Sequence, residues 1–307
     1  FSKVMLDLAK KDDRLVAITA AMEDGTGLAA FHRYYPDRFF DVGIAEGHGV
    51  TFAAGLAAAG LHPVFAVYSS FLQRGFDQMI HDVALQNLPV MFAVDRAGLV
   101  GNDGETHQGI FDLSYLSSIP NMHIMAPKNK WELSDMLKYA VEFDGPIALR
   151  YPRGEAYDGL KEYRRPIEYG KSEVIYEEED IALLAVGNMV KIAEQVRKNL
   201  KEIGYSCTLV NARFVKPIDT EVLDMLSADH KLLVTMEENV RSGGYGEKVM
   251  DYVVEQELPV KLLNISLPDE YVEHGNVALL YEEVGIDAQT VTKRIIEKYI
   301  TCRKEQK

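Results

Sequence analysis

The sequence is poor in cysteine, in basic residues and in long apolar runs, and each shortage excludes a class of protein. Its two cysteines, Cys207 and Cys302, are too few for a disulfide framework and are typical of a reducing cytoplasm. No apolar run reaches the roughly 18 residues that a membrane-spanning helix needs. Lys and Arg number 33 against 47 Asp and Glu, and this formal net charge of −14 argues against binding to nucleic acid or to an anionic membrane.

The motifs of several common enzyme classes are also missing. Gly47 and Gly49 are not followed by the third glycine of a dinucleotide-binding fingerprint. Ser69 and Ser114 lack the surroundings of a nucleophile elbow, and no Cys, His and Asp array has zinc spacing. The glycines of residues 243–246 lack the Gly-Lys-Ser/Thr of a phosphate-binding loop. A nicotinamide, serine-hydrolase or zinc enzyme is therefore disfavoured.

What is present predicts a folded α/β protein of two domains. Hydrophobic residues make up 47% of the chain, and short apolar runs alternate with helical patterns. We expect a doubly wound domain at 1–150, a linker rich in Pro, Gly and charge at 151–166, and a smaller α/β domain at 167–307. The predicted strands are 15–18, 39–42, 63–67, 89–94, 123–125, 146–149, 181–186, 207–211, 232–236 and 260–265, and the predicted helices include 1–8, 46–59, 76–84, 133–141 and 287–299. Because Phe1 opens within a helical pattern and is not Met, we expect residues upstream of it to be missing.

Ligands of open α/β sheets bind beyond the carboxyl ends of the strands, so we expect the site residues just after the strands of the first domain. Gly43-Ile44-Ala45-Glu46-Gly47-His48 follows the second strand. Glu46 is either a charge satisfied by a helix N-terminus or a buried functional acid. His48 has no metal-spaced partner, and by itself it is also typical of a packed histidine at a helix start.

Aromatic and polar residues follow the third strand. Tyr68 and Phe71 are either ordinary core residues or a platform for a flat heterocycle, and Ser69, Ser70 and Arg74 beside them favour the platform.

A long Gly-rich loop follows the fourth strand. It spans residues 95–109, and within it Asp103 and His107 either form a proton-transfer pair or make a local surface contact. After the last strand of the first domain, Arg150 and Arg153 indicate an anion site or an interdomain salt bridge.

These motifs together resemble a known family. Gly43-Ile44-Ala45-Glu46-x-His48 is similar to the glutamate motif of thiamine-diphosphate enzymes of the transketolase group. The segments 68–78, 80–84, 95–98 and 103–109, with Arg150-Tyr151-Pro152-Arg153-Gly154, resemble the 1-deoxy-D-xylulose-5-phosphate synthase family. Residues 212–217 and 237–239 are similar to that family's third domain, so the resemblance covers essentially the whole chain. It implies a pyrimidine-binding transketolase-type domain followed by a smaller transketolase C-terminal-type domain.

The resemblance implies condensation of pyruvate with D-glyceraldehyde 3-phosphate on thiamine diphosphate, with loss of CO2, in isoprenoid and thiamine biosynthesis. Glu46 would share a proton with N1′ of the cofactor's aminopyrimidine. The other roles that the resemblance implies are cofactor contact for Phe71 and Ile44, catalysis for His48, His107 and Asp103, and acceptor phosphate binding for Tyr68, Arg96 and Arg153 with Arg74 close by. A homodimer and a bacterial cytoplasmic location are also expected. The Ala-rich helix of Phe52, Ala53, Leu56 and Ala57 is expected either at an isologous contact or packed on its own sheet.

Two departures from the family pattern limit the prediction. Gly47 stands where the family usually has Gln, which leaves one neighbour of the cofactor undetermined. The Gly-Asp-Gly motif that anchors Mg²⁺ and the diphosphate is absent, and the family carries it in an N-terminal domain. We therefore expect only the second and third domains here, inactive alone and without metal ligands. Half of a split transketolase, a 2-oxoacid dehydrogenase beta subunit and a non-catalytic module of the same fold remain alternatives.

Overall fold

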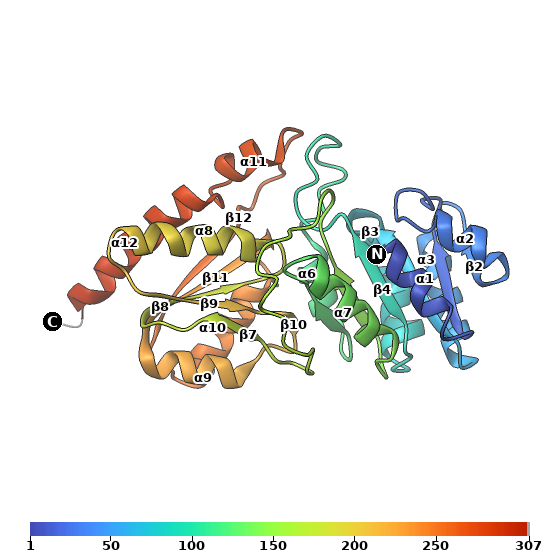
Figure 1. Cartoon of the computed structure of the whole chain (residues 1–307), viewed down its shortest axis with the longest axis horizontal. Coiled ribbons are helices and arrows are strands. Elements are labelled where there is room, and N and C mark those ends of the chain that lie inside the picture. The colour runs from blue at the N-terminus through green and yellow to red at the C-terminus, as the bar shows by residue number, and fades with distance from the viewer. Residues whose placement is uncertain (306–307) are drawn as a thin grey trace.

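The computed structural model describes residues 1–305, which form two α/β domains side by side (Figure 1). The strands are β1 (Leu15–Thr19), β2 (Phe39–Asp41), β3 (His62–Tyr68), β4 (Met91–Asp95), β5 (His123–Met125), β6 (Ile147–Arg150), β7 (Glu173–Tyr176), β8 (Asp180–Ala185), β9 (Cys207–Asn211), β10 (Phe214–Lys216), β11 (His230–Val240) and β12 (Lys261–Leu267). The helices are α1 (Ser2–Ala9), α2 (Ala29–Tyr34), α3 (Glu46–Ala58), α4 (Ser69–Leu72), α5 (Phe76–Gln78), α6 (Asp112–Ser117), α7 (Lys130–Val141), α8 (Met189–Glu202), α9 (Thr220–Asp229), α10 (Tyr245–Glu255), α11 (Val277–Glu283) and α12 (Ala288–Glu305). The predicted fold class is confirmed, and no helix within residues 1–305 is long and apolar enough to cross a membrane.

The strands of the first sheet are continuous apolar runs because both faces of the sheet are buried. Its order is β10-β5-β6-β4-β3-β1-β2, and every pairing except that of β10 is parallel. Alternate residues of β1 enter opposite cores: Val16 and Ile18 pack with α3, while Leu15 and Ala17 pack with α1 and α7. Helices cover both faces, so both must be apolar.

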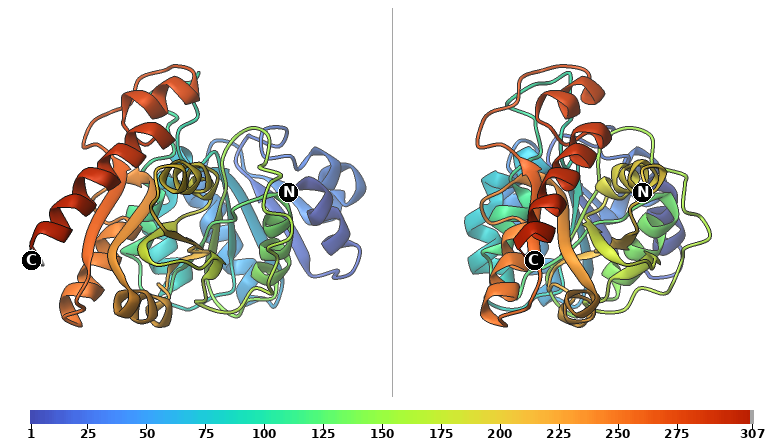
Figure 2. Two further views of the ribbon diagram at one scale, coloured as in Figure 1. Left: turned by 60° about the vertical axis from the view of Figure 1, so that its left-hand side comes forward. Right: turned by 90° about the vertical axis from the view of Figure 1, so that its left-hand side faces the viewer.

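The second sheet has the order β12-β11-β8-β9-β7, parallel except for β7 at its edge (Figure 2). Helices α8 and α12 lie against each other on one side of this sheet, and α9 and α10 lie on the other. All four predicted strands of this domain are present, and β11 extends well beyond the predicted range, to Val240.

Strand β10 joins the two domains. It follows β9 in the sequence, yet it pairs antiparallel with β5 at the edge of the first sheet, with Phe214 opposite Met125. One apolar core therefore runs from the first domain into the second, with Ala126, Val215 and Leu184 among its buried members. The sequence analysis placed this segment wholly in the second domain, because strand pairing across a linker leaves no local signal.

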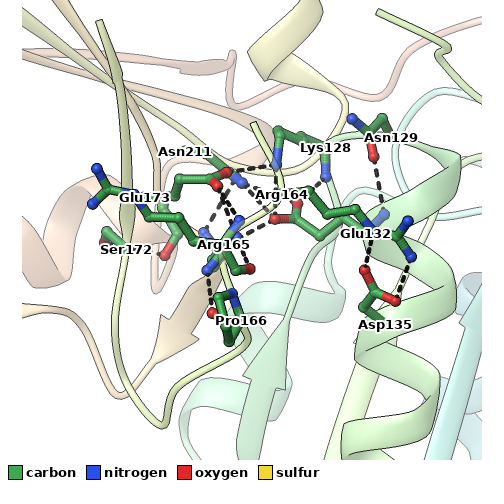
Figure 3. Close-up of polar contacts among 12 residues, drawn as sticks. Lys128, Asn129, Glu132, Asp135, Arg164, Arg165, Pro166, Ser172, Glu173 and Asn211 are labelled. Carbon is green, nitrogen blue, oxygen red and sulfur yellow. Dashed lines mark hydrogen bonds and ion pairs between the residues drawn. The ribbon is translucent and has the colours of Figure 1, made fainter. Parts of the chain in front are cut away.

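A buried charge network lies beside β10 (Figure 3). Glu132, at the start of α7, accepts hydrogen bonds from Lys128 Nζ (3.0 Å), Asn211 Nδ2 (2.9 Å) and Arg213 Nε (2.8 Å). Glu173 on β7 contacts Lys128 Nζ at 2.6 Å and Arg213 at 3.0 Å. The four charged side chains are at most 3% exposed and balance as two cations and two carboxylates. Since Lys128 and Glu132 belong to the first domain and the others to the second, the network fixes the domains to each other.

The structure bears on two local predictions, one for residues 76–84 and one for α3. The single helix predicted over 76–84 is instead a short α5 followed by a π-helical segment, Met79–Ala84. On α3, Ala53 and Ala57 are buried against the sheet, and Phe52 and Leu56 pack on the same core. Packing on the chain's own sheet, one of the two predicted alternatives, therefore accounts for the Ala-rich face.

Candidate active site

Glu46 is buried at the N-terminus of α3. The chain leaves β2 through Gly43, whose φ of +71° suits glycine, and enters α3 at Glu46. The Glu46 side chain is 2% exposed, and it lines a cavity of about 530 Å³. Its carboxylate lies where the dipole of α3 favours a negative charge, and it is also a buried acid facing a cavity. Its functional role stays a prediction.

Phe71 and Arg74 stand beside this carboxylate. Arg74 donates a hydrogen bond to Glu46 Oε1 at 2.6 Å, and its guanidinium lies 4.9 Å from the centre of the Phe71 ring. Ile44, 81% exposed, lines the same cavity at its rim. A buried carboxylate, an aromatic ring and an aliphatic side chain thus face one cavity, and this set of groups fits an aminopyrimidine ring, which is flat and carries ring nitrogens.

Tyr68 stacks on Phe71 and lines the same cavity. The two ring centres lie 5.7 Å apart with an interplanar angle of 21°, and the Arg96 guanidinium lies 3.7 Å from the centre of the Tyr68 ring. The Tyr68 hydroxyl packs against Gly25, where an added Cβ would lie only 1.7 Å from that oxygen. Any side chain at position 25 would therefore displace Tyr68 from the cavity.

Arg96 and Arg153 line a second cavity of about 340 Å³, together with Asp95 and the backbone around Gly25. Burial raises the pKa of Asp95 to about 6, opposed by the neighbouring Arg96. Two of the predicted phosphate ligands thus share the second cavity. Tyr68 lines the first cavity, and its ring contacts Arg96 of the second. Arg74, expected close by these ligands, lines the first cavity with Tyr68 and lies against Glu46 and Phe71.

The loop at 95–109 brings His107 against Phe71, which lines the first cavity. The His107 ring meets the edge of Phe71 at 5.2 Å, and its Nδ1 lies 2.8 Å from Thr106 Oγ1. Asp103 forms an ion pair with Arg153 at 3.0 Å, with both side chains about half exposed. The predicted proton-transfer pair of Asp103 and His107 is therefore wrong in this structure, because each side chain has another partner.

His48 and Arg150 lie outside both cavities. His48 points into a separate hollow with Phe39 and Phe52, and its ring centre is 6.2 Å from that of Phe52. Arg150 is buried and binds Asp112 through Nε at 2.7 Å and the main-chain oxygen of Glu238 at 3.2 Å. The predicted interdomain salt bridge is not formed by Arg150: its salt bridge to Asp112 lies within the first domain, and only its hydrogen bond to Glu238 O reaches the second domain. No catalytic geometry for His48 is formed by residues 1–305.

Several residues of the first cavity were not predicted. Those after β1, residues 20–25, form much of its wall, and Asp41 closes it from the end of β2. Asp41 accepts hydrogen bonds from the backbone nitrogens of Ala21 (2.7 Å) and Gly43 (2.9 Å), so it orders both strand ends. None of these residues after β1 was predicted, although they too follow a strand and so lie where ligands of such sheets bind.

The fold and this site define a class: two parallel α/β domains with the candidate site beyond the carboxyl ends of β1 to β4. Comparison with known families narrows the class. Residues 1–158 match the family described as "Transketolase, pyrimidine binding domain", and residues 170–291 match "Transketolase, C-terminal domain". The chain therefore belongs to the transketolase family.

Curated relatives carry a more specific name. A 1-deoxy-D-xylulose-5-phosphate synthase of Lachnoclostridium phytofermentans is 57% identical over 96% of this chain and 47% of its own length. A protein of the same name from Clostridium tetani is 50% identical over 97% of this chain and 48% of its own. The predicted resemblance is confirmed, and the chain spans about half the length of the curated relatives it matches.

Solved structures show the same architecture. A split-gene transketolase described as an inactive beta4 tetramer is 28% identical, with a TM-score of 0.88 over 98% of this chain and 96% of its own. A transketolase from Campylobacter jejuni, 18% identical, has a TM-score of 0.80 over 96% of this chain and 45% of its own, which concerns the fold alone. Within the part of the chain that the structure describes, no cluster of His, Cys, Asp and Glu could hold a metal ion.

Proposed function

We propose that this chain is the pyrimidine-binding half of a thiamine-diphosphate-dependent synthase that condenses pyruvate with D-glyceraldehyde 3-phosphate to 1-deoxy-D-xylulose 5-phosphate, releasing CO2. The observation that carries the proposal is the buried Glu46 carboxylate facing a cavity that Phe71 also lines. The curated relatives at 50–57% identity support the reaction. The remaining half, which would hold Mg²⁺ and the diphosphate, would come from residues outside this chain.

Each side chain then has a physical role. Thiamine diphosphate, when bound, supplies a thiazolium carbon that becomes nucleophilic on losing a proton. Glu46 would hold the proton that N1′ of the aminopyrimidine needs, and Phe71 and Ile44 would bind that ring through apolar contact. His107, at the edge of Phe71, is placed to move a proton on the substrate. Asp103 positions Arg153 through their ion pair.

The acceptor phosphate would bind at Arg96 and Arg153, with Tyr68 between this site and the cofactor cavity. Guanidinium groups suit phosphate because their planar fork donates two parallel hydrogen bonds. A local pair of arginines also retains an anionic substrate on a chain whose net charge is −14.

Binding and turnover test this proposal together. We expect calorimetry to show weak or no binding of thiamine diphosphate to the chain alone, because the residues that hold a diphosphate are not in it. Combined with a half that carries the Gly-Asp-Gly motif, on one polypeptide or two, the chain should form 1-deoxy-D-xylulose 5-phosphate. Micromolar, magnesium-dependent binding by the chain alone would overturn the division of the site, and an inactive combination would overturn the reaction.

The phosphate site gives a second test. Replacing Arg96 with Ala should raise the KM for D-glyceraldehyde 3-phosphate about 10- to 100-fold, since a hydrogen bond to a charged group contributes about 1.5–3 kcal/mol. The KM for pyruvate, which has no phosphate, should change less than about 3-fold. Arg33→Ala, at an exposed position on α2, is the matched control. Equal changes in both KM values would contradict a phosphate role for Arg96.

A half of a split transketolase remains the second candidate, because the split-gene structure matches nearly the whole chain. Transfer of a two-carbon unit from a ketose phosphate, without release of CO2 from pyruvate, would favour it. Since that neighbour is described as a beta4 tetramer, we also propose that this chain self-associates, with the homodimer as the smallest unit. A cytoplasmic location stays a prediction.

A further inference from the structure

The segment Gly98–Gly109 forms a glycine-rich loop with few hydrogen bonds of its own, among them the turns at Gly104 and His107. Its neck is closed by two backbone hydrogen bonds between Gly98 and Gly109, of 2.6 and 2.8 Å. Gly98, Gly101 and Gly104 adopt positive φ values of +83°, +84° and +71°. Glycine-rich backbone has the most conformational freedom to lose, so contacts with the second domain add to these internal hydrogen bonds in holding the loop in one conformation.

Glu238, at the end of β11 in the second domain, contacts the loop at its neck. Its side chain is 3% exposed, and its Oε1 accepts a hydrogen bond from the backbone nitrogen of Leu99 at 2.7 Å. A Cβ added to Gly98 would lie 2.3 Å from the carboxyl carbon of Glu238. The carboxylate is itself fixed within the second domain, because it also hydrogen-bonds with Asn188 and Tyr281.

Gln108 ties the other arm of the loop to the same domain. It is 2% exposed, and its Oε1 accepts a hydrogen bond from the backbone nitrogen of Val100 at 2.7 Å. Its Nε2 donates to the main-chain oxygen of Glu273 at 3.1 Å. The backbone nitrogen of Gly275 donates to Gly101 O at 3.2 Å, and the loop and the segment before α11 accordingly run side by side (Figures 1 and 2).

We propose that Glu238 and Gln108 are positioning residues through which the second domain holds Asp103 and His107 at the candidate active site. Glu238 and Gln108, which hold the loop, are buried, whereas Asp103, which they position, is about half exposed and pairs with Arg153. The C-terminal domain contributes no side chain to the Glu46 cavity. Through Glu238 it would nevertheless position residues of the site. The catalytic consequence rests on the proposed function, whereas the ordering of the loop does not.

Four variants distinguish a positioning role of these residues from a merely stabilising one. Gln108→Glu keeps the acceptor for Val100 but replaces the donor that faces the carbonyl of Glu273. Glu238→Ala removes the acceptor for Leu99, and Glu238→Gln restores it without the charge. Glu237→Gln is the matched control, because Glu237 is equally buried but accepts hydrogen bonds from Tyr245 and Gly246 within the second domain.

The experiment measures amide hydrogen exchange and steady-state kinetics in the assembled enzyme. For Gln108→Glu and Glu238→Ala we expect exchange of residues 99–107 to rise at least 10-fold while that of β4 is unchanged. The KM for the phosphorylated acceptor should rise at least 10-fold, with thiamine diphosphate binding within 2-fold of wild type. Glu238→Gln and Glu237→Gln should stay within about 3-fold of wild type in both measurements.

Three results would overturn the proposal. They are unchanged loop exchange in both disruptive variants, exchange that rises equally in β4, and loss of cofactor binding instead of acceptor affinity. If the wild-type enzyme forms no product, the proposed function fails while the exchange measurement still tests the anchoring. The failure of one conclusion is thus distinguishable from the failure of the other.

Discussion

Replacing Glu46 with Gln in the assembled enzyme is expected to lower kcat about 10²- to 10⁴-fold, the range typical of a lost general acid or base. Gln fills the same volume at the start of α3, but it cannot share a proton with the aminopyrimidine nitrogen. Because its amide is neutral, it also leaves the Arg74 guanidinium without its carboxylate partner at 2.6 Å. Steady-state kinetics at saturating substrate, with circular dichroism to verify the fold, is the measurement.

A graded series strengthens this test. Glu46→Asp keeps the charge but is one methylene shorter, so we expect a smaller but clear loss of kcat. Glu221→Gln, at a carboxylate on α9 that is 82% exposed and paired with Lys171, is the control and should leave the rate unchanged. Turnover like wild type in the Glu46→Gln enzyme would remove this residue from the mechanism.

Replacing Glu132 with Ala is expected to lower the free energy of unfolding by about 3–5 kcal/mol, the usual cost of removing one partner from a buried ion pair. The variant leaves Lys128 and Arg213 with Glu173 as the one carboxylate of the network, in a region at most 3% exposed. It also deprives Asn211 Nδ2 of both acceptor oxygens. Urea denaturation followed by fluorescence and by circular dichroism measures the change.

The comparison with a surface pair makes the prediction specific. Lys171→Ala breaks an ion pair in which the partner Glu221 is largely exposed, and it should cost less than about 1 kcal/mol. Because the Glu132 network joins the domains, its loss should also separate their unfolding, so that the two probes no longer coincide. A change below 1 kcal/mol for Glu132→Ala, with coincident transitions, would contradict a domain-locking role.

The elements that the sequence predicted best are those with a strong local pattern. The strands of the first sheet are apolar on both faces, and α3 and α7 have stripes long enough to identify them. The short helix α2 and the edge strands β7 and β10 were missed, because a few residues with mixed burial carry little periodicity. The π-helical segment after α5 keeps an apolar face, so the sequence predicted a helix there but not its break.

In the candidate site, too, some features were predictable from the sequence and others were not. Glu46 and Phe71 were predicted from their place after strands and from the resemblance, and both line the first cavity. The partners of charged side chains were less predictable: Arg74 pairs with Glu46, Asp103 pairs with Arg153, and Arg150 pairs with Asp112. Such pairs join residues 28 to 50 positions apart, and sequence spacing carries no record of which charges meet.

By itself the sequence determined the fold class, the family and the residue types available at each strand end, because apolar periodicity and motifs are local properties of the chain. Only the tertiary structure decided that β10 completes the first sheet, that a buried charge network joins the domains, and that Glu238 reaches across to the loop of His107. Those features depend on contacts between distant segments. Such contacts form only when both domains have folded against each other and water has been excluded from between them.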